Sequence, residues 1–267
     1  MTFHLPFSEP PRHRLRLQYA WPLAFGFLSV GCGIKGSGVL VDEERSLAQF
    51  DTIVMSDGFS GRIVPGDDYL VRLIADDNLI DLIEVEVQGE RLKIDLGDRR
   101  TRDATLEVEF VMPGLLQAEL VDGCRLEGRE VPVFEALKLG ARDGSRIELS
   151  VAPEQVLESV NLLALDDSTI HLEAESEQTF ADVDNGSSVE LEGATEMFDL
   201  TVADGSSLQA EDFIAQRVDC SIGDGSSASI WASVSIEGFV NDGSTLELWG
   251  EAEEDLDVRD GSSVSRH

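Results

Sequence analysis

A three-residue turn signal, Asp-Gly-Ser or a close variant of it, recurs eight times from residue 122 onward. Its copies begin at Asp122, Asp143, Asp166, Asn185, Asp204, Asp224, Asp242 and Asp260, at intervals of 18 to 23 residues. A unit of this length is too short to bury its own apolar face, so the units must stack on one another. The repeat therefore restricts the chain to folds in which successive units lie side by side.

Apolar and polar residues alternate on both sides of every turn. The apolar places are the second and fourth before the turn and the fourth and sixth after it. A period of two is typical of half-buried strands, and no helical stripe competes with it. We expect burial of Leu139, Ile147, Leu162, Ile170, Val189, Leu200, Leu208, Ile222 and Leu248. We expect exposure of the intervening Glu148, His171, Glu190, Gln209 and Glu247.

This pattern predicts an all-β protein, specifically a β-solenoid with about 20 residues per rung. A right-handed parallel β-helix is the preferred form, because each repeat place then contacts itself in the next rung. An antiparallel β-sandwich is the alternative, since hairpins also use Asp-Gly turns.

The corner residues have a chemical explanation. Glycine supplies the positive φ angle of a sharp turn. We expect the Asp or Asn side chain to bond to the backbone two residues on, and Ser to do so more weakly. The corner Asp166-Asp167-Ser168 lacks glycine, so it should be strained or differently shaped.

The N-terminus has the features of a secretory signal. Arg12, Arg14 and Arg16 precede the 13 uncharged residues 19–31, a run shorter than the ~20 residues that a membrane span needs. Small residues precede Cys32, as in bacterial lipoprotein signals, where this cysteine carries the lipid. The predicted parts are a lipoprotein-type signal peptide (1–31), a tether (32–50) and a single β-helical domain (51–267), divided into a leading part (51–111) and the repeat rungs (112–267).

Residues 36–111 lack a clear repeat but contain an ordered set of short motifs. They are Gly36-Ser37-Gly38, Glu44-Arg45, Phe50-Asp51-x-Ile53, Pro65-Gly66-Asp67, Asp76-Asp77-Asn78-Leu79 and Leu92-x-Ile94. In this order they resemble the head GIN domain of putative autotransporter adhesins, and the resemblance extends over roughly residues 36–260. It implies an exported protein, often a lipoprotein, with a β-helical fold and no established catalytic residues.

Acidic residues greatly outnumber basic ones, 53 against 20, for a net charge of −33. This charge excludes nucleic acid and anionic membrane surfaces as partners, because phosphate binding needs Lys and Arg. Membrane contact is expected through the lipid anchor only. The remaining partner is an unidentified envelope component or another protein.

An enzyme acting on envelope polysaccharide is the alternative function, because such enzymes also use β-helices. From residue 151 on, however, 27 carboxylates are spread over every rung beside only three arginines. No nucleophile elbow, phosphate loop or His/Cys metal cluster occurs, so we expect no catalytic residues. The preferred function is an exported, lipid-anchored binding or scaffold protein of the cell envelope, located in the outer membrane or periplasm if the cell is Gram-negative.

Two rows of outward places are candidate binding features. Stacked corner carboxylates about 4.8 Å apart repel one another, so they splay into solvent, take up protons or bind a cation. A weak Ca²⁺ ladder is thus the alternative to a purely structural corner, and no other cofactor is expected. Its members would be Asp143, Asp166, Asp204, Asp224, Asp242 and Asp260. Trp231 and Trp249 are either ordinary outward aromatics or a ligand-stacking patch, and His171 is expected to be a surface residue.

The repeat also predicts the state of two cysteines. Cys124 and Cys220 are five rung steps apart, or about 24 Å along the stack, which exceeds the ~7 Å limit for a disulfide. We expect both to be free thiols. Cys220 should be buried, and Cys124 should be a corner thiol that is reactive if exposed.

Overall fold

The computed structural model describes residues 33–267, which form one unit built almost entirely of β-strands. The predicted signal segment 1–31 and the predicted lipidation residue Cys32 lie outside the described residues. Within the described part, the one helical element is a 3₁₀ turn, η1 (Ile80–Leu82). No helix there is long and apolar enough to cross a membrane.

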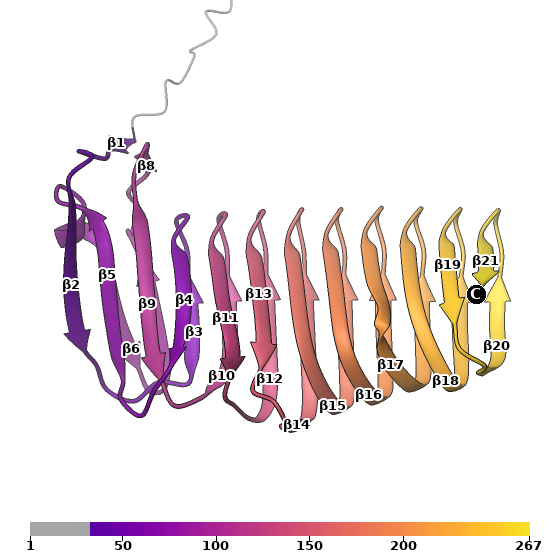
Figure 1. The fold of residues 1–267 in the computed structure, drawn as a ribbon. Helices are drawn as coiled ribbons and strands as arrows, with labels where there is room; N and C mark the ends of the chain where they lie inside the picture. Colours follow the sequence, from indigo (N-terminus) through magenta and orange to yellow (C-terminus); the bar gives the residue numbers. More distant parts are fainter. Residues whose placement is uncertain (1–32) are drawn as a thin grey trace, which may run out of the picture. The chain divides into compact units, whose positions relative to one another are not determined.

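From residue 115 the chain winds into a regular stack of rungs (Figure 1). Ser188 pairs with Ser207, and Ser207 pairs with Ser227, so each repeat place meets itself one rung later. Every strand pairing within the stack from residue 115 on is parallel. The predicted parallel β-solenoid is therefore confirmed, and the antiparallel sandwich is excluded.

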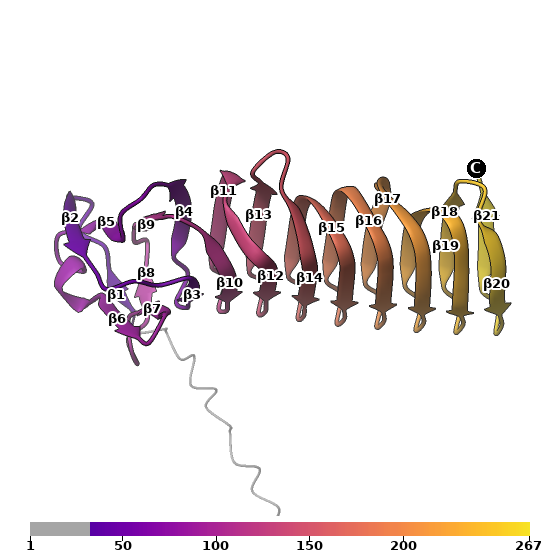
Figure 2. The ribbon, with the colours of Figure 1, turned by 90° about the horizontal axis from the view of Figure 1, so that it is seen from below.

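Each rung has two limbs that face each other across the core (Figure 2). An Asp-Gly-Ser corner joins them at one edge, and a gentler bend joins them at the other. In β15 to β18 hydrogen-bonded pairing continues around the bend, so one strand supplies both limbs. The strands of the stack are β10 (Leu115–Leu120), β11 (Arg125–Val131), β12 (Val133–Ala141), β13 (Arg146–Val151), β14 (Val156–Ala164), β15 (Thr169–Val183), β16 (Ser188–Val202), β17 (Ser207–Ile222), β18 (Ser227–Val240), β19 (Thr245–Trp249), β20 (Glu253–Val258) and β21 (Ser263–Arg266).

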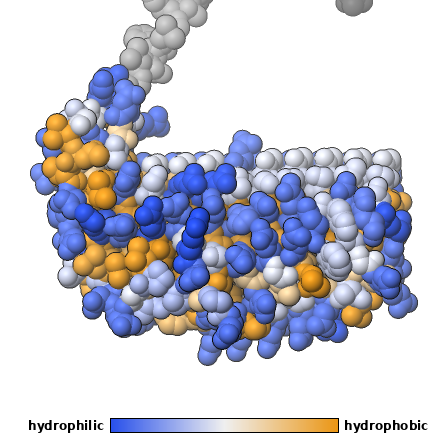
Figure 3. All heavy atoms as spheres, in the orientation of Figure 1, coloured by the Kyte–Doolittle hydropathy of each residue, from blue (hydrophilic) through white to orange (hydrophobic). Residues whose placement is uncertain are grey.

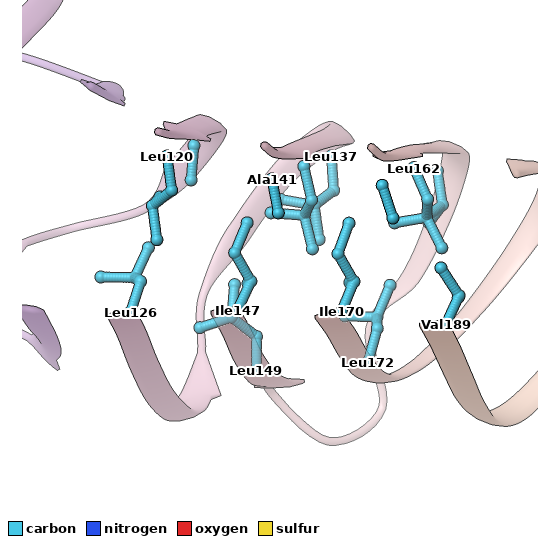
Figure 4. Packing of buried hydrophobic residues seen from close by; sticks show 14 of the residues in the cluster. Leu120, Leu126, Leu137, Ala141, Ile147, Leu149, Leu162, Ile170, Leu172 and Val189 are labelled. Carbon is cyan, nitrogen blue, oxygen red and sulfur yellow. The ribbon is translucent and has the colours of Figure 1, made fainter. Parts of the chain in front are cut away.

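The core is a continuous apolar column between the two limbs, shown in part in Figure 4. All nine side chains predicted to be buried are at most 4% exposed. Of the five predicted to be exposed, Glu190, Gln209 and Glu247 are exposed. Glu148 and His171 are instead half-buried, because ion pairs hold them against neighbouring rungs.

The leading part of the chain inserts one rung out of sequence order. Strand β3 pairs in parallel with both β7 and β10, and β4 pairs in parallel with both β9 and β11. Residues 52–65 therefore lie between the strands of residues 91–112 and those of residues 115–131. This rung has its own corner, Asp57-Gly58-Phe59, which stands 65 residues before Asp122 and so escapes the 20-residue period.

Antiparallel strands close this end of the stack. Strand β5 pairs with β2 and β9, and β6 pairs with β7. Residues 34–46, placed in a tether from the sequence, instead form β1 and β2, because β2 covers the free edge of β5. The strands here are β1 (Ile34–Lys35), β2 (Leu40–Ser46), β3 (Thr52–Met55), β4 (Ser60–Pro65), β5 (Leu70–Asp76), β6 (Glu84–Gln88), β7 (Arg91–Asp95), β8 (Thr101–Arg102) and β9 (Leu106–Met112).

Candidate functional site

The corner backbone explains why aspartate and glycine recur. The eight Asp or Asn residues that begin the corners have φ between +50° and +58°, and the glycines that follow have φ between +71° and +80°. Both values are left-handed, and Asp and Asn tolerate this region better than other non-glycine residues. Among the described residues no corner Asp accepts a bond from the backbone two positions on, so that expectation is wrong. Asp167 takes the glycine place at φ +60°, so this corner keeps the left-handed shape of the others, and it is strained in that a non-glycine residue stands where the others have glycine.

The corner serines hold successive rungs together. Each Oγ accepts a bond of 3.0 to 3.2 Å from the backbone N–H of the equivalent residue one rung earlier. The hydroxyls therefore bond between rungs. The expectation that each serine bonds within its own corner is wrong. This row explains why serine is required at the third corner place.

Both described cysteines are free, as predicted, and Cys220 is buried, as predicted. Cys124 takes the serine place of its corner but is only 1% exposed, so the condition for a reactive thiol is not met. Burial raises the pKa of Cys124 to about 12, and burial likewise raises the pKa of Cys220 to about 12.

The predicted Ca²⁺ ladder is a row of exposed carboxylates along one edge of the stack. All six of its Asp residues are exposed, and their corners line the upper edge in Figure 1. Figure 3 shows this edge as a pale band above a largely hydrophilic face. The negative charge of Asp184, followed by its hydrogen bond and by the charge of Asp224, raises the pKa of Asp204. This repulsion at Asp204 comes first from Asp184, which is not a member of the row, and protons or cations would relieve it there.

The predicted tryptophan pair lies at the bends, on the side of the rung away from the corners. Trp231 and Trp249 are partners in register, and Ile214 precedes them in the same row. The Trp249 ring stacks on His267 with centroids 4.6 Å apart and an interplanar angle of 16°. Trp231 has no aromatic partner in the part of the chain that the structure describes, and Ile214 is 49% exposed. Counting from the turns misses Ile214 because extra residues shift the register between Ala210 and Ile214.

A shallow groove of about 730 Å³ crosses the outer face of β4, β11, β13 and β15. Arg62 and Arg129 line it at one end, and His171 and Glu173 line it at the other. Arg62 pairs with Glu127 at 3.0 Å, so much of the positive charge is neutralised locally. The groove is lined about equally by polar and apolar groups, and it contains no cysteine.

One buried carboxylate is explained by structure alone. Asp76 is 2% exposed and accepts bonds from the backbone N–H groups of Gly38 at 2.6 Å and Thr105 at 2.8 Å. The bond from Thr105 and then that from Gly38 hold the pKa of Asp76 below its ordinary value. This carboxylate fixes the closing strands of the N-terminal end, which accounts for the acidic motif at residues 76–79.

Comparison with solved structures identifies the same fold. A putative adhesin from Parabacteroides merdae aligns with a TM-score of 0.76 at 14% identity, over 88% of this chain and 99% of that one. A putative adhesin from Parabacteroides distasonis gives 0.71 at 16% identity, over 88% and 100%. A putative lipid binding protein from Parabacteroides distasonis gives 0.72 at 15% identity, over 88% and 99%. At these identities the likeness concerns the fold alone.

A family model gives the more specific result. No match is found among curated proteins. The model described as putative auto-transporter adhesin, head GIN domain, matches residues 49–252, which is most of the chain. The resemblance drawn from the motifs at residues 36–94 is confirmed, and the chain belongs to the putative auto-transporter adhesin family with a head GIN domain.

Proposed function

We propose that this protein is an exported, lipid-anchored adhesin-type binding protein of the cell envelope. The observation that carries the proposal is the family match over residues 49–252. The basic cluster, the uncharged run and Cys32 support export and anchoring by lipid. The spread of carboxylates over all rungs supports a binding role over a catalytic one.

The row of Ile214, Trp231 and Trp249, here called the bend row, is the proposed contact surface. Its members stand on three adjacent rungs of a rigid parallel sheet. Aromatic and apolar side chains of this kind suit the face of a neutral sugar ring or an apolar protein side chain. Because His267 covers one face of Trp249, we expect Trp231 to contribute most to stacking. The net charge of −33 disfavours an anionic ligand.

The anchor is tested by cell fractionation of the full chain and a Cys32→Ser variant. We expect the parent protein to partition with membranes in detergent, and the variant to be released or to remain as the precursor. Mass spectrometry of the exported protein should show a lipidated Cys32. An unmodified Cys32 in the exported protein would remove the anchor from the proposal.

The contact surface is tested on an array of envelope glycans, lipids and proteins. We expect Trp231→Ala to weaken binding about 3- to 10-fold, which corresponds to about 0.5–1.5 kcal/mol for one aromatic contact. The matched control is Phe239→Ala, which removes an exposed aromatic from β18, the strand on which the half-buried Trp231 also stands. Equal binding by both variants and the parent would place the contact elsewhere on the protein.

The row of corner aspartates is tested by repeating the binding array with and without Ca²⁺ and by calorimetry with Ca²⁺. If the row binds a hard cation, binding should be weak, sensitive to salt and reduced by Asp→Asn changes at Asp204, Asp224 and Asp242. An absence of heat and of thermal shift at millimolar Ca²⁺ would leave the corners with a structural role only.

A further inference from the structure

Three potential metal ligands meet on the outer face of the stack, at the end of the groove. His171 stands on β15, while Glu190 and Glu192 stand on β16. His171 Nδ1 lies 3.0 Å from Glu190 Oε2, and His171 Nε2 lies 3.8 Å from Glu192 Oε1. One ligand atom from each residue lies within 4.8 Å of the other two, and no other group of this kind occurs among residues 33–267.

The fold holds these three residues together. His171 and Glu190 are partners in register, so their side chains leave the same face of the sheet one rung apart. Glu192 is two positions further along β16 and therefore also points outward. Strands β15 and β16 pair without interruption from residue 169 to residue 176, which holds the three ligands on adjacent strands, although the register of β16 with the next rung shifts between Glu190 and Glu192.

The donor set indicates which class of ion it would bind. One imidazole nitrogen with two carboxylates suits Zn²⁺ and similar transition-metal ions, whereas Ca²⁺ prefers oxygen ligands alone. Ligand atoms about 2.0–2.2 Å from a tetrahedral ion stand roughly 3.4 Å apart, and a small shift of the side chains would bring the three ligand atoms, which lie within 4.8 Å of one another, to this spacing. The Glu190 and Glu192 side chains are 52% and 47% exposed, so either can pivot toward a single imidazole nitrogen.

The surrounding charge favours a cation. Arg125 and Arg146 both form ion pairs with Glu148, at 3.3 Å and 3.6 Å. Glu148 thereby keeps them one rung away from His171. Glu173 lines the groove beside His171 and has no ion-pair partner in the described part of the chain. Glu173, Glu190 and Glu192 thus surround one imidazole with three carboxylates.

We propose that His171, Glu190 and Glu192 form a binding site for a divalent transition-metal ion of the zinc class. Three protein ligands leave at least one coordination position of such an ion for water or for a donor group of a bound partner. The site lies on the outer face of the limb that follows the corners, and it does not depend on the adhesin-type function.

Zinc titration of the chelator-treated full chain tests the proposal, with calorimetry and metal analysis as readouts. We expect one Zn²⁺ per chain to be lost in His171→Ala and in Glu190→Gln, with affinity reduced at least about 10-fold. Glu247→Gln is the matched control for Glu190→Gln. Glu247 lies in the same outward column as Glu190, three rungs later, and is beyond reach of His171. This control should bind Zn²⁺ like the parent.

The remaining outcomes separate this site from general attraction to an acidic surface. Co²⁺ absorption should report a nitrogen ligand in the parent and lose that signature in His171→Gln, which retains a polar side chain. Circular dichroism of each variant verifies that the solenoid is intact. Equal Zn²⁺ binding by the parent and all variants, or Ca²⁺ binding as tight as that of Zn²⁺, would overturn the proposal.

Discussion

Removal of one hydroxyl from the row of corner serines tests how the rungs are held together. Ser206 is 2% exposed, and its Oγ accepts a 3.2 Å bond from the backbone N–H of Ser187. That N–H has no other acceptor among the described residues. The change Ser206→Ala therefore leaves a buried donor unpaired, which costs about 1–3 kcal/mol of unfolding free energy.

The next serine of the row gives a graded comparison. Ser226 Oγ accepts a 3.2 Å bond from the N–H of Ser206, but this N–H also bonds to the carbonyl of Ala203 at 3.1 Å. After Ser226→Ala the donor keeps a partner, so the expected cost is only about 0.5–1.5 kcal/mol. Ser227 is exposed and its hydroxyl makes no bond within the described residues. Ser227→Ala should therefore stay within about 0.5 kcal/mol of the parent.

Thermal unfolding at pH 7 measures these differences. For a chain of this size, 1 kcal/mol shifts the melting temperature by about 2–4 °C. At the middle of the expected ranges, Ser206→Ala should lower it by about 4–8 °C and Ser226→Ala by about 2–4 °C, with little change for Ser227→Ala. Equal shifts for the two buried serines would refute the argument that an unshared hydrogen bond sets the cost.

Three further predictions concern the backbone, the thiols and pH. Gly193→Ala should cost about 3 kcal/mol, because its Cβ would lie 2.1 Å from a backbone oxygen of the preceding rung at φ +120°, whereas Gly140→Ala has room and should be nearly neutral by the same melting assay. Peptide mapping after thiol labelling should find Cys124 and Cys220 unmodified in the native protein and both modified after unfolding, since each pKa is raised to about 12 by burial. Asp76→Asn should lower the melting temperature at pH 7, and the difference should shrink as the pH falls below about 4. The reason is that the lowered pKa of Asp76 stabilises the fold above the ordinary value of 3.8, and this stabilisation is lost as the carboxylate is protonated.

The regular part of the fold could be predicted because every rung repeats the same local chemistry. The alternation around Asp204 and Asp224 determines which side chains enter the core, and the equal spacing determines that equivalent places stack. The position of the rung formed by residues 52–65 could not be predicted in this way. Its strands have the same alternation as any other rung and would satisfy it beside either neighbour. Its insertion between two rungs that come later in the chain depends on long-range strand pairing, and no local sequence pattern indicates that pairing.

The candidate sites divide along the same line. Trp231 and Trp249 are found by counting from their turns, because no residue is inserted between turn and ring. Ile214 is missed because the bend before it is longer. His171 and Glu190 both stand five places after their turns, so the period alone would have paired them. What the period does not reveal is that their side chains turn toward each other.

In a stack of repeats, a binding site is best indicated by an outward position whose residue type differs from that of the equivalent positions in neighbouring rungs. Inward columns and corners are constrained by packing, so their repetition reports stability rather than binding. In the column of Glu148, His171 and Glu190, a histidine takes the place of an acidic residue at one rung. In the bend row, a tryptophan follows isoleucine at Trp231. His171 and Trp231 are three rungs apart, or about 14 Å along the stack, which exceeds the ~8 Å screening length at physiological salt. Zinc binding at His171 and ligand binding at Trp231 should therefore respond to mutation independently. A double variant, His171→Ala with Trp231→Ala, should show the sum of the two separate effects, whereas strong coupling would mean that one ligand spans both places.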